Sequence, residues 1–258
     1  MRHSMKKTTP KKSRLPAGVP EALAAIGIFL AVFLAIVIIR YNSTPAETPE
    51  DTAVTIPVET SAEKSIADNI TLPLTLADGI SLTGMYAVDA LFPEDGSNAG
   101  GTNLLCCVVK NDTDKTLEYM TFTLTTGEET YEFALSTLPP ACELYAFEKN
   151  AAEAPEKITD LTAETQIQLF FDEELTLMKD QLEITIGNGS IDVKNITDTP
   201  TDREIQVYYK NTENLAYFGG ITYFLRVPAG LAPGETYNGY AANASTSRTE
   251  VMFVKYGN

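Results

Sequence analysis

The chain has 258 residues, with 19 Lys and Arg against 35 Asp and Glu, and its formal net charge is −16. The first forty residues carry seven basic side chains against Glu21, a charge of +6, so the remainder carries −16 − 6 = −22. Nucleic acid and anionic lipid surfaces would repel so acidic a segment, which argues against both as its partners.

Residues 22–39 form an apolar stretch without a charged side chain or a proline. As a helix, eighteen residues would cover about 27 Å, close to the thickness of a bilayer's hydrocarbon core. We therefore predict a transmembrane helix over residues 17–40, preceded by a basic cytoplasmic tail at residues 1–16. Lys and Arg beside a first membrane helix stay on the cytoplasmic side, so we expect the rest of the chain outside. A cleaved signal peptide is the alternative, and the long apolar run argues against it.

Residues 41–78 are rich in Thr, Pro, Ala and Glu, with Pro45, Pro49 and Pro57 interrupting any regular structure. Such a composition buries too little apolar surface to offset the entropy lost on ordering. We interpret this segment as a flexible stalk.

From residue 79 the pattern changes to short runs rich in β-branched and aromatic residues, separated by Gly, Pro, Asn and Asp. Several runs alternate apolar and polar side chains, as strands with one buried face do. The runs form two series and predict an all-β fold; they cover residues 80–88, 103–109, 117–124, 131–135, 143–147 and 165–170, and then residues 182–186, 190–193, 204–209, 221–227, 236–240 and 251–254.

The two series resemble each other. Val109-Lys-Asn-Asp-Thr-Asp114 matches Val193-Lys-Asn-Ile-Thr-Asp198, and Leu138-Pro-Pro140 before one strand matches Leu231-Ala-Pro233 before another. Asn, Asp and Thr after a strand are typical of turns in which the side chain bonds the backbone. Six or seven short strands, twice over, predict two tandem immunoglobulin-like β-sandwiches, at residues 79–175 and 176–258.

The recurring Val-Lys-Asn-x-Thr-Asp turn and the closing stretch from Gly219 to Thr236 resemble membrane-anchored envelope proteins of clostridial-type Gram-positive bacteria. They are also similar to FxLYD-type immunoglobulin-like modules, although that motif itself is absent and Glu143-Leu-Tyr-Ala146 is its nearest counterpart. The resemblance implies a fold and an envelope location. It implies no catalytic residue.

The only histidine is His3, in the predicted cytoplasmic tail. The predicted external part therefore lacks an imidazole for a Ser-His-Asp triad, a Cys-His pair or a histidine metal ligand. We expect no enzymatic activity and no cofactor.

Three cysteines, Cys106, Cys107 and Cys142, lie in the predicted external part. If Val109 faces inward, Cys107 faces the core and Cys106 faces outward, because side chains alternate along a strand. A disulfide between Cys107 and Cys142 would then link the two sheets of a sandwich covalently. The alternative is that all three stay free as small apolar side chains.

Two groups of side chains are candidates for binding. Consecutive carboxylates at Asp172, Glu173 and Glu174 could hold Ca²⁺ between the predicted domains, although solvated acidic turns are the usual alternative. Aromatic side chains concentrate in the second series, and those considered for an interaction surface are Tyr208, Tyr209, Tyr217 and Phe218. Their alternative role is packing within the sheets.

An anchor, a stalk and two sandwiches are typical of a display architecture. We therefore expect a non-enzymatic interaction or adhesion module that meets a protein or cell-wall partner outside the cell membrane. A structural or assembly subunit of a membrane or envelope complex is the alternative.

Overall fold

The computed structural model describes residues 64–257. The predicted tail, the predicted transmembrane helix and residues 41–63 of the predicted stalk lie outside the described residues. Within residues 64–257 there is no helix long and apolar enough to cross a membrane.

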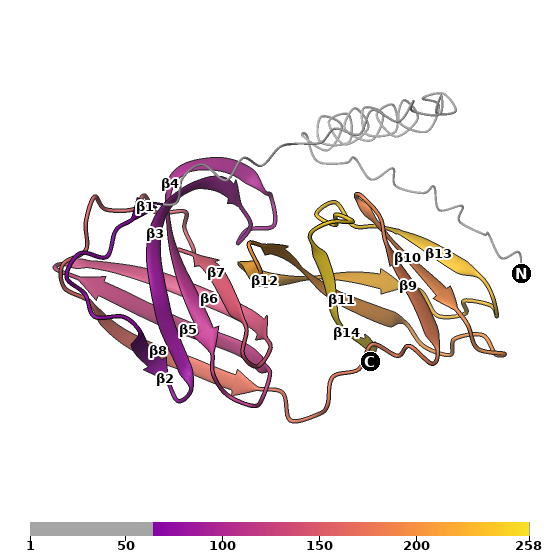
Figure 1. Cartoon of the computed structure of the whole chain (residues 1–258). Coiled ribbons are helices and arrows are strands. Elements are labelled where there is room, and N and C mark those ends of the chain that lie inside the picture. The colour runs from indigo at the N-terminus through magenta and orange to yellow at the C-terminus, as the bar shows by residue number, and fades with distance from the viewer. Residues whose placement is uncertain (1–63, 258) are drawn as a thin grey trace, which may run out of the picture. The chain divides into compact units, whose positions relative to one another are not determined.

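The described part is all-β, with sheets consistent with a β-sandwich, which confirms the predicted fold class at this level. We call β1–β8 the N-terminal half and β9–β14 the C-terminal half (Figure 1). The strands are β1 Lys64–Ser65, β2 Leu74–Ala77, β3 Ile80–Phe92, β4 Ala99–Asn111, β5 Leu117–Thr126, β6 Glu129–Leu138, β7 Glu143–Phe147, β8 Thr162–Phe170, β9 Leu182–Ile186, β10 Ser190–Asn195, β11 Ile205–Glu213, β12 Ala216–Val227, β13 Thr236–Tyr240 and β14 Thr249–Tyr256.

Each half contains the same two three-stranded arrays. In the N-terminal half the strand orders are β3-β4-β7 and β6-β5-β8, and in the C-terminal half they are β9-β10-β13 and β12-β11-β14. The sequence repeat therefore corresponds to a repeat of strand topology, in which β3 matches β9, β4 matches β10 and β7 matches β13.

The halves are joined by a short parallel pairing of β7 with β12, in which Leu144 lies opposite Tyr217 and Tyr145 opposite Phe218. One sheet therefore runs through both halves in the order β1-β3-β4-β7-β12-β11-β14, with β2 paired to β3. Both halves belong to one compact unit. The expected boundary at residue 176 separates the two strand series, but whether each half folds alone stays a prediction.

The expected stalk is too long at its C-terminal end. Strands β1 and β2, within residues 64–78, both pair with β3, and Ile66 is only 2% exposed. The alternation Leu72, Leu74, Leu76 supplies apolar side chains to the core, so these residues belong to the fold even though Pro73 and the polar composition around them resemble a linker.

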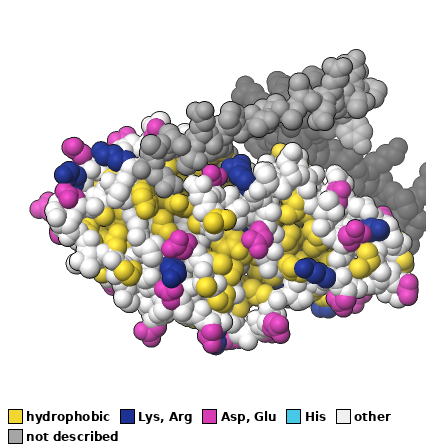
Figure 2. All heavy atoms as spheres, viewed as in Figure 1, with side chains coloured by type: hydrophobic (Ala, Val, Ile, Leu, Met, Phe, Trp, Pro, Cys, Tyr) yellow, Lys and Arg dark blue, Asp and Glu magenta, His cyan; other side chains and the backbone are white. Residues whose placement is uncertain are grey.

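Apolar alternation places a separate core in each half. The N-terminal core includes the stacked rings of Phe122 and Phe133, whose centroids are 5.1 Å apart. The C-terminal core gathers around Ile191, Val193 and Val207, all fully buried. On the face seen in Figure 2, hydrophobic side chains also reach the surface among acidic ones.

The predicted turn after β4 is built around Asn111, which is fully buried. Its side-chain amide donates to the carbonyl oxygens of Lys115 and Leu138 at 2.9 and 2.8 Å. Its Oδ1 accepts from the backbone N–H of Thr113 at 3.0 Å. One side chain thus satisfies three backbone groups that leave the sheet.

Asn195 makes the same bonds after β10. Its amide donates to the carbonyl oxygens of Thr199 and Leu231 at 2.8 and 2.9 Å, and its Oδ1 accepts from the N–H of Thr197 at 2.9 Å. The expectation that these asparagines serve equivalent structural turns is confirmed.

Candidate binding site

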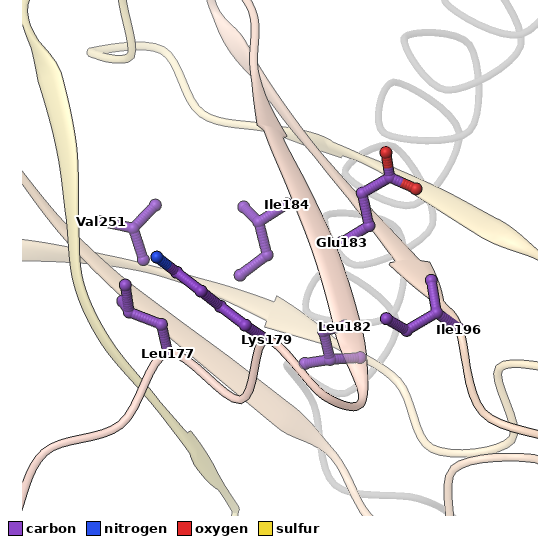
Figure 3. Close-up of a pocket in the computed structure, with 7 residues that line it drawn as sticks. All are labelled: Leu177, Lys179, Leu182, Glu183, Ile184, Ile196 and Val251. Atoms are coloured by element: carbon purple, nitrogen blue, oxygen red, sulfur yellow. The ribbon is translucent and has the colours of Figure 1, made fainter.

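A groove of about 420 Å³ lies in the C-terminal half, a size typical of ligand-binding pockets. Its walls come from β9, from β14 and from the segments that precede β9 and follow β10 (Figure 3). Its lining is mostly apolar; the residues are Leu177, Lys179, Leu182, Glu183, Ile184, Ile196 and Val251. Ile196 is 45% exposed, so apolar surface at this site remains open to solvent.

The groove borders a sheet edge, because β9 is the last strand of the sheet β13-β10-β9. The N–H of Gly187 bonds the carbonyl of Ser190, which fixes the alternation of hydrogen bonds along the β9–β10 ladder. By that alternation, Ile184 and Ile186 direct their backbone N–H and C=O groups away from β10. The site therefore combines apolar side chains with an open edge of backbone donors and acceptors.

Lys179 supplies the positive charge of the groove. Its side chain points toward Leu177, Ile184 and Val251 in Figure 3. Among the residues that the structure describes, no carboxylate lies within ion-pair distance of its ammonium group. Glu183 lines the same groove and is paired with Lys194 at 3.2 Å.

A second unusual site lies where the halves meet. Lys210 of β11 is fully buried, and its ammonium group donates to the carbonyl oxygens of Ser136 at 3.0 Å and Ile221 at 2.7 Å. Glu94, between β3 and β4, accepts from the backbone N–H groups of Phe147 at 3.0 Å and Gly220 at 2.8 Å. A buried cation and a half-buried carboxylate thus each bond groups from both sides of the junction.

Burial changes the proton affinity of both groups. Desolvation lowers the pKa of Lys210 to about 7, and the negative charge of Glu94 opposes this fall. Desolvation raises the pKa of Glu94, while the N–H bonds from Gly220 and Phe147 oppose the rise. All donors and acceptors here are met within the fold and neither group lines the groove, so we interpret the junction as structural.

The possible bridge between Cys107 and Cys142 does not form, and the alternative of free cysteines holds. None of the three cysteines forms a disulfide. Cys107 lies opposite Ala146, whereas the carbonyl of Cys142 accepts from the N–H of Asn111 at the far end of the same ladder. Four residues of strand separate the two positions by about 13 Å, well beyond the 7 Å limit between the Cα atoms of a disulfide.

Cys106 also departs from the expectation that it faces outward, because it is fully buried. It packs with Val88, Phe92 and Phe147 in a third, small core. The outer side of β4 is therefore covered, which the alternation within the strand alone did not show.

The structure brings Cys142 of one half to Tyr217 of the other. The Tyr217 hydroxyl donates to Glu250 at 3.1 Å and also bonds the Cys142 side chain. Burial is the largest cause of the raised pKa of the Cys142 thiol, and Glu250 raises it further. This environment disfavours the thiolate, so the cluster does not activate a nucleophile.

The proposed Ca²⁺ ligands Asp172, Glu173 and Glu174 are exposed consecutive side chains between β8 and β9. Within residues 64–257 no group of three or more His, Cys, Asp or Glu side chains is placed to hold a metal ion.

The expected aromatic surface is mostly interior. Tyr209 and Tyr217 are 4% and 7% exposed and belong to the two cores. Phe218 is half-buried, with its ring centroid 5.2 Å from that of Phe147. Tyr208 is also half-buried and stacks on Phe253 at 4.3 Å. These residues do not form one exposed cluster.

Sequence reasoning missed both the groove and the junction. Ile184 and Val251 were assigned to strands, but nothing local shows which strand lacks a neighbour. Lys210 directly follows Tyr209, so strict alternation would place it on the face opposite Val207 and Tyr209. Its burial depends on register shifts in the pairing of β11 with β12 and β14, which the local pattern does not show.

No protein-family model matches the chain, and no curated protein sequence matches it.

Proposed function

We propose that this protein is a non-enzymatic binding module, displayed outside the cell membrane as two tandem immunoglobulin-like sandwiches behind a single transmembrane helix. The apolar run at residues 22–39 and the basic tail support the anchor and its orientation. The repeated strand topology supports the tandem arrangement. The resemblance to FxLYD-type modules and clostridial envelope proteins supports the fold and the location.

The observation that carries the binding function is the groove beside β9. Large apolar side chains line it, and β9 leaves its outer backbone groups open. An exposed apolar groove with polar groups at its rim is typical of interaction sites in soluble domains. Binding also agrees with the chemistry of the external part, which has no histidine and holds Cys142 as a thiol of raised pKa.

Photo-crosslinking in intact cells tests the binding function. A photoreactive phenylalanine analogue at Ile196 places the probe in the groove of the full chain. The matched control replaces Tyr240, which is 83% exposed on β13, the opposite edge of the same sheet. We expect an adduct from position 196 that position 240 does not give. Equal labelling from both positions, or none from 196, would argue against the groove as the binding site.

Limited proteolysis of intact cells tests the location. Because β1 and β2 are paired with β3, we expect cleavage at residues 42–63 and release of a compact fragment, while the basic tail stays protected. A chain that is cut only after the membrane is permeabilised would contradict the proposed orientation.

A further inference from the structure

The two halves differ at one edge. The register pairs Leu82 of β3 with Val109 and Ile184 of β9 with Val193. Since the turns at Asn111 and Asn195 are equivalent, and each valine lies two residues before its asparagine, Ile184 occupies the position of Leu82. The N-terminal half therefore shows what a covered version of the β9 edge looks like.

In the N-terminal half, β2 covers that edge. Leu74 pairs antiparallel with Leu82, which is fully buried. Leu76, two residues on, is only 8% exposed and packs into the core. Its carbonyl accepts from the Thr165 hydroxyl of β8 at 2.7 Å, so β2 bridges the space between β3 and β8.

In the C-terminal half no described strand pairs with β9 on this side. The segment before β9 turns instead to β14, where the carbonyl of Thr176 accepts from the N–H of Val254 at 2.8 Å. Ile184 remains partly exposed, and the groove lies beside it. The place that β2 fills in one half is open in the other.

We propose that the β9 edge accepts an extended peptide strand from a partner protein. The strand pairs with the outward backbone groups of Ile184 and Ile186 and inserts alternate apolar side chains into the groove, as β2 does against β3. Main-chain hydrogen bonds supply affinity and alternate side chains supply specificity in this mode of recognition. The inference rests on the proposed function and specifies the chemistry of its partner.

The charges add one requirement to the partner strand. Residues 64–257 contain 12 Lys and Arg and 29 Asp and Glu, a net charge of 12 − 29 = −17. Against that background Lys179 places a cation in the groove that has no carboxylate partner within residues 64–257. An acidic residue next to the apolar alternation therefore fits the site, and β2 itself is followed by Asp78.

The β2 segment provides a probe of defined sequence. A fluorescent synthetic peptide of residues 70–79, Ile-Thr-Leu-Pro-Leu-Thr-Leu-Ala-Asp-Gly, is titrated onto the full chain in detergent micelles. Hydrogen exchange is measured with and without the peptide. We expect saturable binding and slower exchange at Ile184 and Ile186, because their amides gain partners. Absence of binding at millimolar peptide, or protection confined to other strands, would overturn strand addition at β9.

Matched variants distinguish peptide binding in the groove from non-specific binding elsewhere on the protein. A peptide with Leu74 and Leu76 both replaced by Ser, and the chain with Ile184→Lys, should each bind about tenfold or more weakly, since apolar burial in the groove is lost. The chain with Tyr240→Ser should bind as wild type. Unchanged exchange in β10 and β11 shows that Ile184→Lys still folds.

The outcomes also distinguish this inference from the proposed function. If Ile184 and Ile186 are protected without peptide and the chain is dimeric, a second copy occupies the edge and the partner strand is wrong. If the peptide does not bind while the photoreactive probe at position 196 still gives its specific adduct in cells, the binding function is supported and strand addition is wrong. If both fail, both proposals are wrong.

Discussion

The ammonium group of Lys210 lies 3.0 Å from the carbonyl oxygen of Ser136, so a fully buried cation of the C-terminal half bonds the backbone of the N-terminal half. A buried cation costs desolvation energy unless its donors are satisfied. Here further carbonyl oxygens, from Gly220 and Ile221, complete its surroundings at 3.2 and 2.7 Å. The junction is therefore sensitive to the protonation of one side chain.

We expect stability to rise with pH above neutrality because of Lys210. Burial lowers its pKa from 10.5 to about 7, so between these values the unfolded chain binds a proton that the folded chain has lost. The free energy of unfolding then increases with pH, by up to about 1.4 kcal/mol per unit. Urea denaturation from pH 7 to pH 10 should show this slope, and Lys210→Met should flatten it. If the Lys210→Met variant kept the wild-type dependence of unfolding free energy on pH, Lys210 would not be the cause of that dependence.

Gly220→Ala should destabilise the junction. A Cβ at this position would lie 2.0 Å from the carbonyl oxygen of Ala134, a backbone atom that cannot swing away. We expect a loss of about 2 kcal/mol or more in the free energy of unfolding. Gly100→Ala on β4 is the matched control, because its Cβ would meet nothing within 4 Å. Its effect should stay within about 0.5 kcal/mol.

The same variant addresses the predicted independence of the halves. If each half folds alone, Gly220→Ala should leave hydrogen exchange slow at Phe122 and Val193, in the two separate cores, while the junction loosens. Faster exchange in both cores together would show that the halves form one cooperative unit.

Asn195→Leu should lower the free energy of unfolding by about 2 kcal/mol, since the carbonyls of Thr199 and Leu231 and the N–H of Thr197 lose their partner within the fold. The control is Asn238→Leu, an exposed position on β13. Thermal or urea denaturation measures both. Unchanged stability together with lost crosslinking at the groove would make the turn a recognition element instead.

Thiol labelling should distinguish Cys142 from the other two cysteines. Cys106 and Cys107 are fully buried, so native protein should react with iodoacetamide only at Cys142, and slowly, because burial raises the pKa of that thiol. Mass spectrometry after unfolding without reductant should find three alkylated cysteines. A peptide pair linked through Cys107 and Cys142 would contradict the observed register.

Local patterns predicted many strands well because those strands bury one face. The run at residues 131–135 alternates apolar and polar side chains and lies within β6, and the predicted strand at 236–240 coincides with β13. Asn111 and Asn195 were predictable as turns because two of the bonds of each side chain join residues within four positions, and this pattern recurs in both halves.

Long-range pairing is what local patterns lack. Nothing in the sequence near Tyr217 shows that β12 pairs with β7, so the burial of Tyr217 by the other half could not be predicted. The same limit applies to β2, whose four residues look like part of a linker until their partner β3 is known. The groove depends on a strand that β9 lacks, which only comparison of the two folded halves reveals.

The β7–β12 pairing also has a mechanical consequence. A pulling force between β1 and β14 is carried by the backbone ladders of one continuous sheet and not only by the covalent segment at residues 171–181. The ladder that joins the two halves along that path spans only Tyr217 and Phe218 of β12. The bonds of Lys210 and Glu94 act beside it, so tension would have to break polar contacts in a desolvated interior before the halves could separate and the chain lengthen.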